Sequence, residues 1–236
     1  MDRKSLAILI LTIILSLFIV TVVVLLSVFI PIFEEETEDK IKYYSDLSEH
    51  ATKGQVVFLG DSITEFYRTS EFFHEYSPYN RGIAGDTTDG VLARLQDNVI
   101  VLEPKKVFLC IGTNDLARVK KDKVNYIVNN IIEIVTTIEN SLPDTKVYVV
   151  SILPVNRSLN IYSRYVLKSR NNEDIDSINE RLKEYCEEND VTFIDINTHL
   201  KDEKGNLQKE YTLEGLHISF KGYQVITELL KPYLEE

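Results

Sequence analysis

The chain has 236 residues, which is enough for one domain of ordinary size with an appendage and short for two full domains. It contains 37 Asp and Glu residues against 26 Lys and Arg, and its formal net charge of −11 argues against a protein that binds nucleic acid through a basic face. The composition also excludes collagen, coiled coils, disulfide-rich mini-proteins and disordered chains. The first 33 residues hold only three charged groups, Asp2, Arg3 and Lys4, so the remaining chain has a net charge of −12.

An uncharged, apolar segment of 25 residues runs from Leu6 to Ile30. As a helix it rises roughly 37 Å, more than the ~30 Å hydrocarbon core of a bilayer, so it can span a membrane with some tilt. The alternative is a cleaved signal peptide, whose apolar region usually has about 7–15 residues before a small-residue cleavage site. This segment is longer and continues through Pro31-Ile32-Phe33 into acidic residues without such a site. The pattern favours an uncleaved signal anchor over residues 1–33.

Charged residues on either side of the apolar segment predict its orientation. Arg3 and Lys4 precede it, and the next cation in the chain is Lys40. Because the flank richer in Lys and Arg stays in the cytoplasm, we expect a single-pass protein of the cell membrane with a cytoplasmic N-terminus. The acidic domain would then lie outside the cytoplasm.

Cys110 and Cys186 are the only cysteines of the chain. Cys110 lies within the apolar segment Val107–Ile111, which predicts a thiol buried in the core. A disulfide is possible in an extracytoplasmic compartment, but two cysteines by themselves do not establish one.

The segment between the anchor and the domain is expected to hold a linker and a lead-in helix, over residues 34–53. Glu34–Lys40 is acidic and predicts a solvated linker. The helix is indicated by apolar residues at helical spacing, namely Ile41, Tyr44 and Leu47.

The soluble domain, residues 54–236, alternates short apolar segments with longer amphipathic ones. This alternation implies parallel strands with helices on both faces of the sheet, an α/β fold. The polar, aperiodic stretch Asn156–Asn172 is predicted to be a long loop. Strands are expected at Val56–Leu59, Tyr79–Ile83, Val107–Ile111, Val147–Leu153 and Val191–Ile196, and helices at 88–102, 122–141, 173–190 and 219–234.

In such a fold, ligands bind beyond the carboxyl ends of the parallel strands. The residues that follow the first three strands therefore indicate where a site would form, together with a short motif before the last helix. These segments are Gly60-Asp61-Ser62, Gly85-Asp86-Thr87, Gly112-Thr113-Asn114-Asp115 and Glu214-Gly215-Leu216-His217.

The residues in these segments suit acyl transfer through a serine. The hydroxyl of Ser62 needs a base to take its proton, which His217 can supply, and Glu214 can orient the imidazole ring. The oxyanion that develops needs fixed hydrogen-bond donors. The backbone N–H groups of Ser62 and Gly85 and the side-chain amide of Asn114 can provide them.

Each of these residues also has a purely structural explanation. Ser62 and Asn114 could cap helices, and Gly85 could simply allow a turn. A histidine is commonly a surface or core residue, and His199 is a rival base, although no acid stands at a matching distance from it. The order and common position of the four segments favour the catalytic explanation.

Four ordered sequence blocks resemble the SGNH, or GDSL, hydrolase superfamily. The second block resembles in particular the branch that contains the catalytic subunits of platelet-activating-factor acetylhydrolase and related bacterial esterases. The resemblance covers about residues 54–233. The blocks are Val57–Thr64, Asn80–Thr88, Gly112–Asp115 and Gly215-Leu216-His217 followed by Gly222-Tyr223.

The resemblance implies a three-layer α/β/α sandwich with a parallel, flavodoxin-like sheet. It also implies Ser62 as the nucleophile, His217 as the base and an oxyanion hole formed by Ser62, Gly85 and Asn114. The family usually has Asp three residues before the histidine, where this chain has Glu214, so the same hydrogen bond requires a different rotamer or a shifted turn. The nearby acids lack the family's spacing, namely Asp202 and Glu210.

The chain contains no H-E-x-x-H, paired C-x-x-C or phosphate-binding G-x-x-x-x-G-K-[ST] motif, and we expect no metal or cofactor. The leading hypothesis is a membrane-anchored serine ester hydrolase that forms an acyl-serine intermediate. Its substrate would be an acylated glycan or a lipid-derived ester. An acyltransferase with the same residues is one alternative, and a binding domain that has lost catalysis, with Glu214 as an early sign, is another.

Overall fold

The computed structural model describes the backbone of residues 2–236 and the side chains of residues 2–27 and 35–236. The chain forms two compact units, and the boundary between them falls between Tyr43 and Tyr44. One helix, α1 (Arg3–Ser48), crosses this boundary.

α1 differs from the expected linker followed by a separate helix. It continues without interruption through the segment expected to be a solvated linker, Glu34–Lys40. Residues 35–48 contain neither Gly nor Pro, so no strong helix breaker interrupts this segment. The residues predicted to lead from the apolar segment into the acidic one, 31–34, lie outside the residues whose side chains are described.

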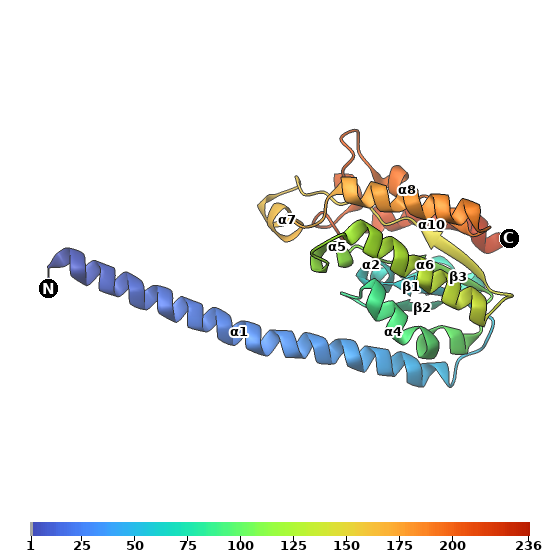
Figure 1. The fold of residues 1–236 in the computed structure, drawn as a ribbon, viewed down its shortest axis with the longest axis horizontal. Helices are drawn as coiled ribbons and strands as arrows, with labels where there is room; N and C mark the ends of the chain where they lie inside the picture. Colours follow the sequence, from blue (N-terminus) through green and yellow to red (C-terminus); the bar gives the residue numbers. More distant parts are fainter. Residues whose placement is uncertain (1) are drawn as a thin grey trace. The chain divides into compact units, whose positions relative to one another are not determined.

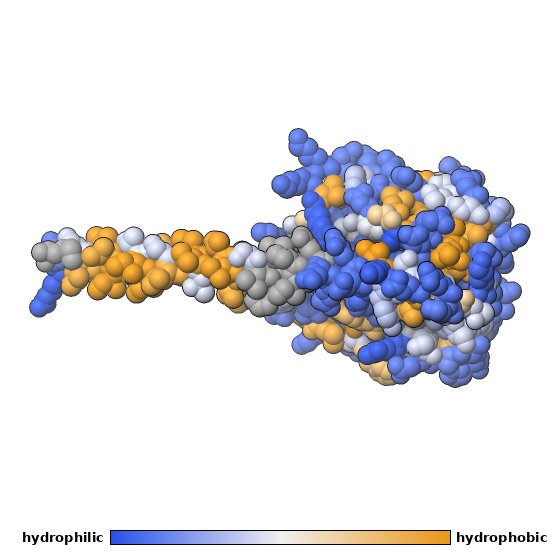
Figure 2. Space-filling view, turned by 90° about the horizontal axis from the view of Figure 1, so that it is seen from below, coloured by the Kyte–Doolittle hydropathy of each residue, from blue (hydrophilic) through white to orange (hydrophobic). Residues whose placement is uncertain are grey.

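The N-terminal part of α1 is an apolar helix with exposed side chains. Every residue from Asp2 to Ser27 is exposed, and Figure 2 shows hydrophobic side chains along the visible face of this helix. Arg3–Ser27 is long and apolar enough to cross a membrane, a test that a signal sequence near the N-terminus also passes. The side chains of residues 28–30 of the predicted span lie outside those described.

The second unit is built on a five-stranded parallel sheet (Figure 1), which confirms the predicted α/β class. The strand order β2-β1-β3-β4-β5 places β2 on one side of β1 and β3 on the other. Chain connections diverge at this point, and such a switch point is where open α/β sheets bind ligands. The strands are β1 (Val56–Gly60), β2 (Tyr79–Gly82), β3 (Lys106–Cys110), β4 (Lys146–Val150) and β5 (Thr192–Ile194).

Helices cover both faces of the sheet. Successive residues of a strand point to opposite faces, so Val57 and Leu59 join one hydrophobic core, and Val56 and Phe58 join the other. The first core is closed by α4 (Thr88–Asn98), α6 (Lys123–Ser141) and α8 (Asn172–Glu188), and the second by α2 (Ser62–Phe66) and α10 (Phe220–Glu235).

Shorter elements differ from the predicted boundaries. α4 ends at Asn98, and a 3-10 turn replaces the predicted end of that helix. The stretch predicted to be a loop contains a helix, α7 (Ile161–Val166), which begins where the side chain of Asn160 accepts a hydrogen bond from the Ser163 N–H. The remaining short elements are α3 (Thr69–Phe72), α5 (Asp115–Arg118), α9 (Asn197–Leu200), η1 (His74–Tyr76), η2 (Ile100–Leu102) and η3 (Lys209–Tyr211).

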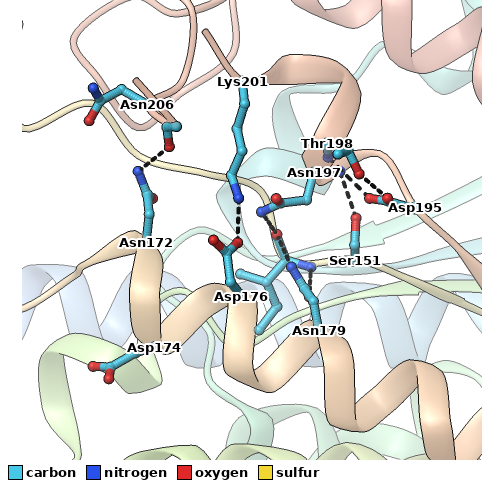
Figure 3. Close-up of polar contacts among 12 residues, drawn as sticks. Ser151, Asn172, Asp174, Asp176, Asn179, Asp195, Asn197, Thr198, Lys201 and Asn206 are labelled. Carbon is cyan, nitrogen blue, oxygen red and sulfur yellow. Dashed lines mark hydrogen bonds and ion pairs between the residues drawn. The ribbon is translucent and has the colours of Figure 1, made fainter. Parts of the chain in front are cut away.

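Polar side chains fasten the segments that follow β4 and β5 (Figure 3). Ser151 Oγ accepts hydrogen bonds from the backbone N–H groups of Ile196 and Asn197, at 2.8 and 2.9 Å. Asn179 of α8 exchanges two hydrogen bonds with the backbone of Ile152, at 2.8 and 2.9 Å. Because each of these buried polar groups has a partner, the carboxyl end of β4 has a defined position beside the loops that form the site.

Candidate active site

Ser62 lies at the turn between β1 and α2, at the carboxyl edge of the sheet. Asp61 caps α2, because its Oδ1 accepts a hydrogen bond from the Ile63 N–H at 2.9 Å. The helix cap is therefore Asp61, and the interpretation of Ser62 as the cap is wrong. A Cβ atom on Gly60 would lie 2.2 Å from the carbonyl oxygen of Cys110, so this close approach of β1 and β3 requires glycine.

Ser62, His217 and Glu214 form a continuous chain of hydrogen bonds. His217 Nε2 lies 3.1 Å from Ser62 Oγ, and His217 Nδ1 lies 2.7 Å from Glu214 Oε1. The same Oε1 accepts a second hydrogen bond from the backbone N–H of His217 at 3.0 Å. With Nδ1 protonated, Nε2 is free to accept the serine hydrogen, which is the tautomer that a general base requires.

The longer side chain of Glu214 is accommodated by a fixed turn. Gly215 has φ +100°, and a Cβ atom there would lie 2.4 Å from the carbonyl oxygen of Asn156. Thr212 Oγ1 accepts a hydrogen bond from the Gly215 N–H and donates one to the His217 carbonyl, both at 2.8 Å. This turn places the Glu214 carboxylate at the imidazole ring, where the family's usual residue is one methylene shorter.

Asn114 follows β3 and reaches the segment after β2, in which Gly85 precedes its hydrogen-bond partner. Asn114 Nδ2 donates to the carbonyl of Asp86, the residue after Gly85, at 2.9 Å. Asn114 is the N-cap residue of α5, as the structural explanation predicted, but its side chain makes no capping hydrogen bond and is directed elsewhere. Gly85 has φ +79°, a conformation that L side chains rarely adopt.

Residues 58–225 match the model of the GDSL-like lipase/acylhydrolase family. The chain belongs to this family. The predicted resemblance to the superfamily is thereby confirmed.

Two solved structures illustrate the likeness. A Streptococcus pneumonia protein provisionally described as a platelet activating factor is 33% identical, with a TM-score of 0.82 over 90% of this chain and 99% of that one. A GDSL-like lipase from Bacteroides thetaiotaomicron is 28% identical, with a TM-score of 0.73 over 83% of this chain and 97% of that one.

Curated relatives have two kinds of name. Platelet-activating factor acetylhydrolase IB subunit alpha1 of Rattus norvegicus is 26% identical over 185 residues, which cover 76% of this chain and 75% of the relative. An N-acylneuraminate cytidylyltransferase of Streptococcus agalactiae is 27% identical over 205 residues, which cover 85% of this chain. The chain spans only 44% of the length of that relative, so its cytidylyltransferase name describes a much longer protein.

Arg170 is a buried residue of the candidate site that no sequence motif indicated. Its Nη2 donates to Asn114 Oδ1 at 3.0 Å, and its Nε donates to the Thr113 carbonyl at 2.9 Å. Burial lowers the pKa of Arg170. With Oδ1 bound to the guanidinium, the amide nitrogen of Asn114 points the other way, toward the segment that contains Gly85. Arg170 therefore acts as a positioning residue for the Asn114 amide.

Replacing Arg170 with Met should lower kcat by about tenfold, because the Asn114 amide loses the partner that fixes its orientation. Asn114→Ala should lower kcat by roughly 10²-fold, the usual cost of removing one oxyanion donor. If Arg170 acts through Asn114, the Arg170 change should cost little in the Asn114→Ala background. Steady-state kinetics of the two single variants and the double variant measure this coupling.

The exposed Arg118 of α5 provides the control. Arg118→Met removes an equal charge near the same site and keeps the backbone hydrogen bond from the residue 118 N–H to the Asn114 carbonyl, at 3.2 Å. Thermal unfolding checks that each variant is folded. Equal losses from the Arg170 change in both backgrounds would contradict the positioning role and leave Arg170 as a structural residue only.

Three buried carboxylates near the nucleophile affect one another electrostatically, namely Asp61, Asp86 and Asp115. The pKa of Asp61 is raised to about 7, chiefly by burial and in smaller part by the charges of Asp86 and Asp115, while the hydrogen bond from the Ile63 N–H lowers it. Burial also raises the pKa of Asp86, although its Oδ2 pairs with Arg94 Nε at 2.8 Å. The folded state is therefore expected to lose stability as the Asp61 carboxyl ionises.

We expect the free energy of unfolding to fall as the pH rises from the unfolded-chain pKa of Asp61, 3.8, to its folded value of about 7. In this pH window the folded state binds more protons than the unfolded chain, so stability falls as the pH rises. Above the window the whole loss of stability from ionised Asp61 is present. Asp61→Asn keeps the oxygen that accepts from the Ile63 N–H and removes the titration. Its stability relative to the wild type should rise with pH, by at most roughly 1.4 kcal/mol per pH unit.

Urea unfolding of both proteins across this pH range measures the difference. Asp97→Asn, an exposed carboxylate on α4, should show no comparable trend. A relative stability of Asp61→Asn that stays constant or falls with pH would contradict the buried, protonated Asp61.

The remaining candidates lie away from this chain of hydrogen bonds. His199 is exposed on α9, and Asp202 accepts hydrogen bonds from the backbone of its own turn. Glu210 pairs with Lys221 at the surface. Cys110 is partly rather than fully buried, with Sγ 3.8 Å from the Ser151 carbonyl, and both cysteines of the chain are free thiols.

Proposed function

We propose that the protein is a membrane-anchored carboxylic ester hydrolase that works through an acyl-enzyme on Ser62. One observation supports this proposal above the others: the hydrogen bonds from Ser62 Oγ to His217 Nε2 and from His217 Nδ1 to Glu214, at 3.1 and 2.7 Å. A hydroxyl, an imidazole and a carboxylate in this order are the components that activate a serine nucleophile. Membership of the GDSL-like lipase/acylhydrolase family supports the same chemistry.

In the acylation step, Ser62 Oγ attacks the carbonyl carbon of the ester while His217 Nε2 takes the hydroxyl proton. The carbonyl oxygen becomes an oxyanion, which the N–H groups of Ser62 and Gly85 and the Asn114 amide would stabilise. Glu214 would stabilise the imidazolium through Nδ1–H. His217 then gives its proton to the departing alcohol oxygen as the carbon–oxygen bond breaks, and the acyl-serine remains.

In the deacylation step, a water molecule replaces the alcohol. His217 Nε2 removes a proton from the water as its oxygen attacks the acyl-serine carbonyl, and the same proton returns to Ser62 Oγ when the acid leaves. An acceptor alcohol in place of water would give acyl transfer.

A fluorophosphonate probe and p-nitrophenyl esters of graded chain length test the proposed activity. We expect covalent labelling that maps to Ser62 and hydrolysis of at least the acetyl ester, with free acid as the product in the presence of an acceptor alcohol. Absence of labelling at Ser62 in folded protein would contradict the proposal. An ester of the added alcohol as the main product would identify a transferase instead.

The apolar helix Arg3–Ser27 supports the membrane anchor, and the flanking charges support a domain outside the cytoplasm. Full-length protein should stay in the membrane fraction after a carbonate wash, and protease added to intact cells should digest the domain. A soluble form that starts near residue 34 would indicate a cleaved signal, and protection from the protease would indicate the opposite orientation. The proposed substrates are acylated glycans or lipid-derived esters at the membrane.

A further inference from the structure

α7 is a short helix that presents a large apolar surface to the solvent. It rests on the domain through Ser163 and, one turn later, Leu167, both 1% exposed. Soluble proteins rarely gather several large exposed apolar side chains without a binding function. The exposed fractions are 87% for Ile161, 62% for Tyr162, 72% for Tyr165 and 43% for Val166.

The same segment is basic in an acidic domain. Residues 157–170 contain four cations and no Asp or Glu, although the chain after residue 33 has a net charge of −12. Arg164 and Lys168, one turn apart, are exposed, and within the described part of the chain no carboxylate forms an ion pair with either. Lys168 Nζ lies 5.1 Å from the ring centre of Tyr165. Cations and apolar side chains therefore share one outward surface.

α7 is attached to the loop that carries the proposed acid and base. Ser163 Oγ donates to the Glu214 carbonyl at 2.7 Å. Leu167 lies against Gly215, since a Cβ atom on that glycine would be 3.2 Å from Leu167 Cδ1. A surface bound by α7 would therefore lie next to the loop that holds His217.

We propose that α7 docks on an anionic lipid surface and holds the Ser62 site beside esters carried by the bilayer. Tyrosine is enriched at the membrane–water interface, the apolar face of an interfacial helix enters the headgroup boundary, and Arg and Lys are attracted to anionic headgroups. The proposal rests on the membrane anchoring and hydrolase activity proposed above, because α1 keeps the domain near a bilayer. A symmetric dimer through α7 is disfavoured, since it would bring Arg164 and Lys168 of two copies together.

The chain contains no tryptophan, so Tyr165→Trp introduces a single fluorescent reporter on α7. Full-length protein would be placed in nanodiscs of phosphatidylcholine with phosphatidylglycerol, at one copy per disc, with brominated lipid as the quencher. The matched control is Val101→Trp, because Val101 is also exposed (39%) but lies in η2, before β3 at the amino end of the sheet.

We expect the emission of Tyr165→Trp to shift to shorter wavelength and to be quenched at least about threefold more than that of Val101→Trp. Equal quenching at the two positions would overturn the proposal. So would a shift that is absent at one copy per disc and grows with the number of copies, because it would identify a second copy of the chain as the partner.

The charged residues give a second, independent arm. Arg164→Gln with Lys168→Gln, in the Tyr165→Trp background, should reduce the quenching about twofold or more in anionic discs and change little in discs of phosphatidylcholine alone. Lys183→Gln, an exposed lysine of α8, is the control. Quenching that is unaffected by the double change would overturn the anionic part of the proposal.

Fluorophosphonate labelling of Ser62 in the same nanodiscs separates the two proposals. Labelled protein without bromolipid quenching would reject docking and keep the hydrolase. Unlabelled protein with strong quenching would reject the hydrolase and keep a lipid-binding helix.

Discussion

Ser62→Ala should lower kcat by roughly 10⁴–10⁶-fold, because the acyl-enzyme cannot form without the hydroxyl. Fluorophosphonate labelling should disappear with it. The fold should persist, since the hydroxyl contacts His217 Nε2 and the cap of α2 is provided by Asp61. Initial rates on p-nitrophenyl acetate and a thermal unfolding curve measure the two effects.

Ser141→Ala is the control, because this serine is exposed at the end of α6. It should leave both rate and labelling unchanged. Retention of more than a few per cent of wild-type activity by Ser62→Ala would exclude Ser62 as the nucleophile and leave the hydrogen-bonded chain without its proposed role.

Glu214→Gln should lower kcat by roughly 10²-fold, because the imidazolium formed during acylation loses its charged partner. The structure makes this a test of charge. Glu214 Oε1 accepts from both His217 Nδ1 and the His217 backbone N–H, so an amide should keep its oxygen toward these two donors. The tautomer of the ring is then preserved, and the loss measures the electrostatic contribution.

Glu214→Asp tests whether the carboxylate must extend as far as the glutamate side chain does. It keeps the charge but shortens the side chain by about 1.5 Å, while Gly215 and Thr212 hold the turn in the form that suits glutamate. We expect a loss of about tenfold. Glu210→Gln, at the surface ion pair with Lys221, is the control. A Gln variant within threefold of the wild-type kcat would indicate a Ser62–His217 dyad without a contribution from the acid.

Much of the architecture could be predicted because a parallel sheet covered on both faces needs continuous apolar strands. Val56–Leu59 and Val107–Ile111 predicted β1 and β3 to within one residue at either end. Motif spacing indicates Ser62, His217 and Glu214, together with the rule that ligands bind at the carboxyl edge of a parallel sheet. No knowledge of tertiary contacts is needed for this prediction. Their catalytic roles stay predictions that the two experiments above address.

The tertiary structure alone decided which groups support that edge. Arg170 lies 56 residues from Asn114 in the chain, and only folding brings its guanidinium to the amide, so no local pattern could indicate it. α7 was predicted to be a loop because its sequence lacks the apolar periodicity that identifies a helix. Only Ser163 in the helix and Leu167 directly after it are buried against the domain, and the apolar side chains of α7 are exposed. The continuity of α1 through its acidic segment was equally hidden, since charge indicates solvent exposure but does not distinguish a linker from a helix.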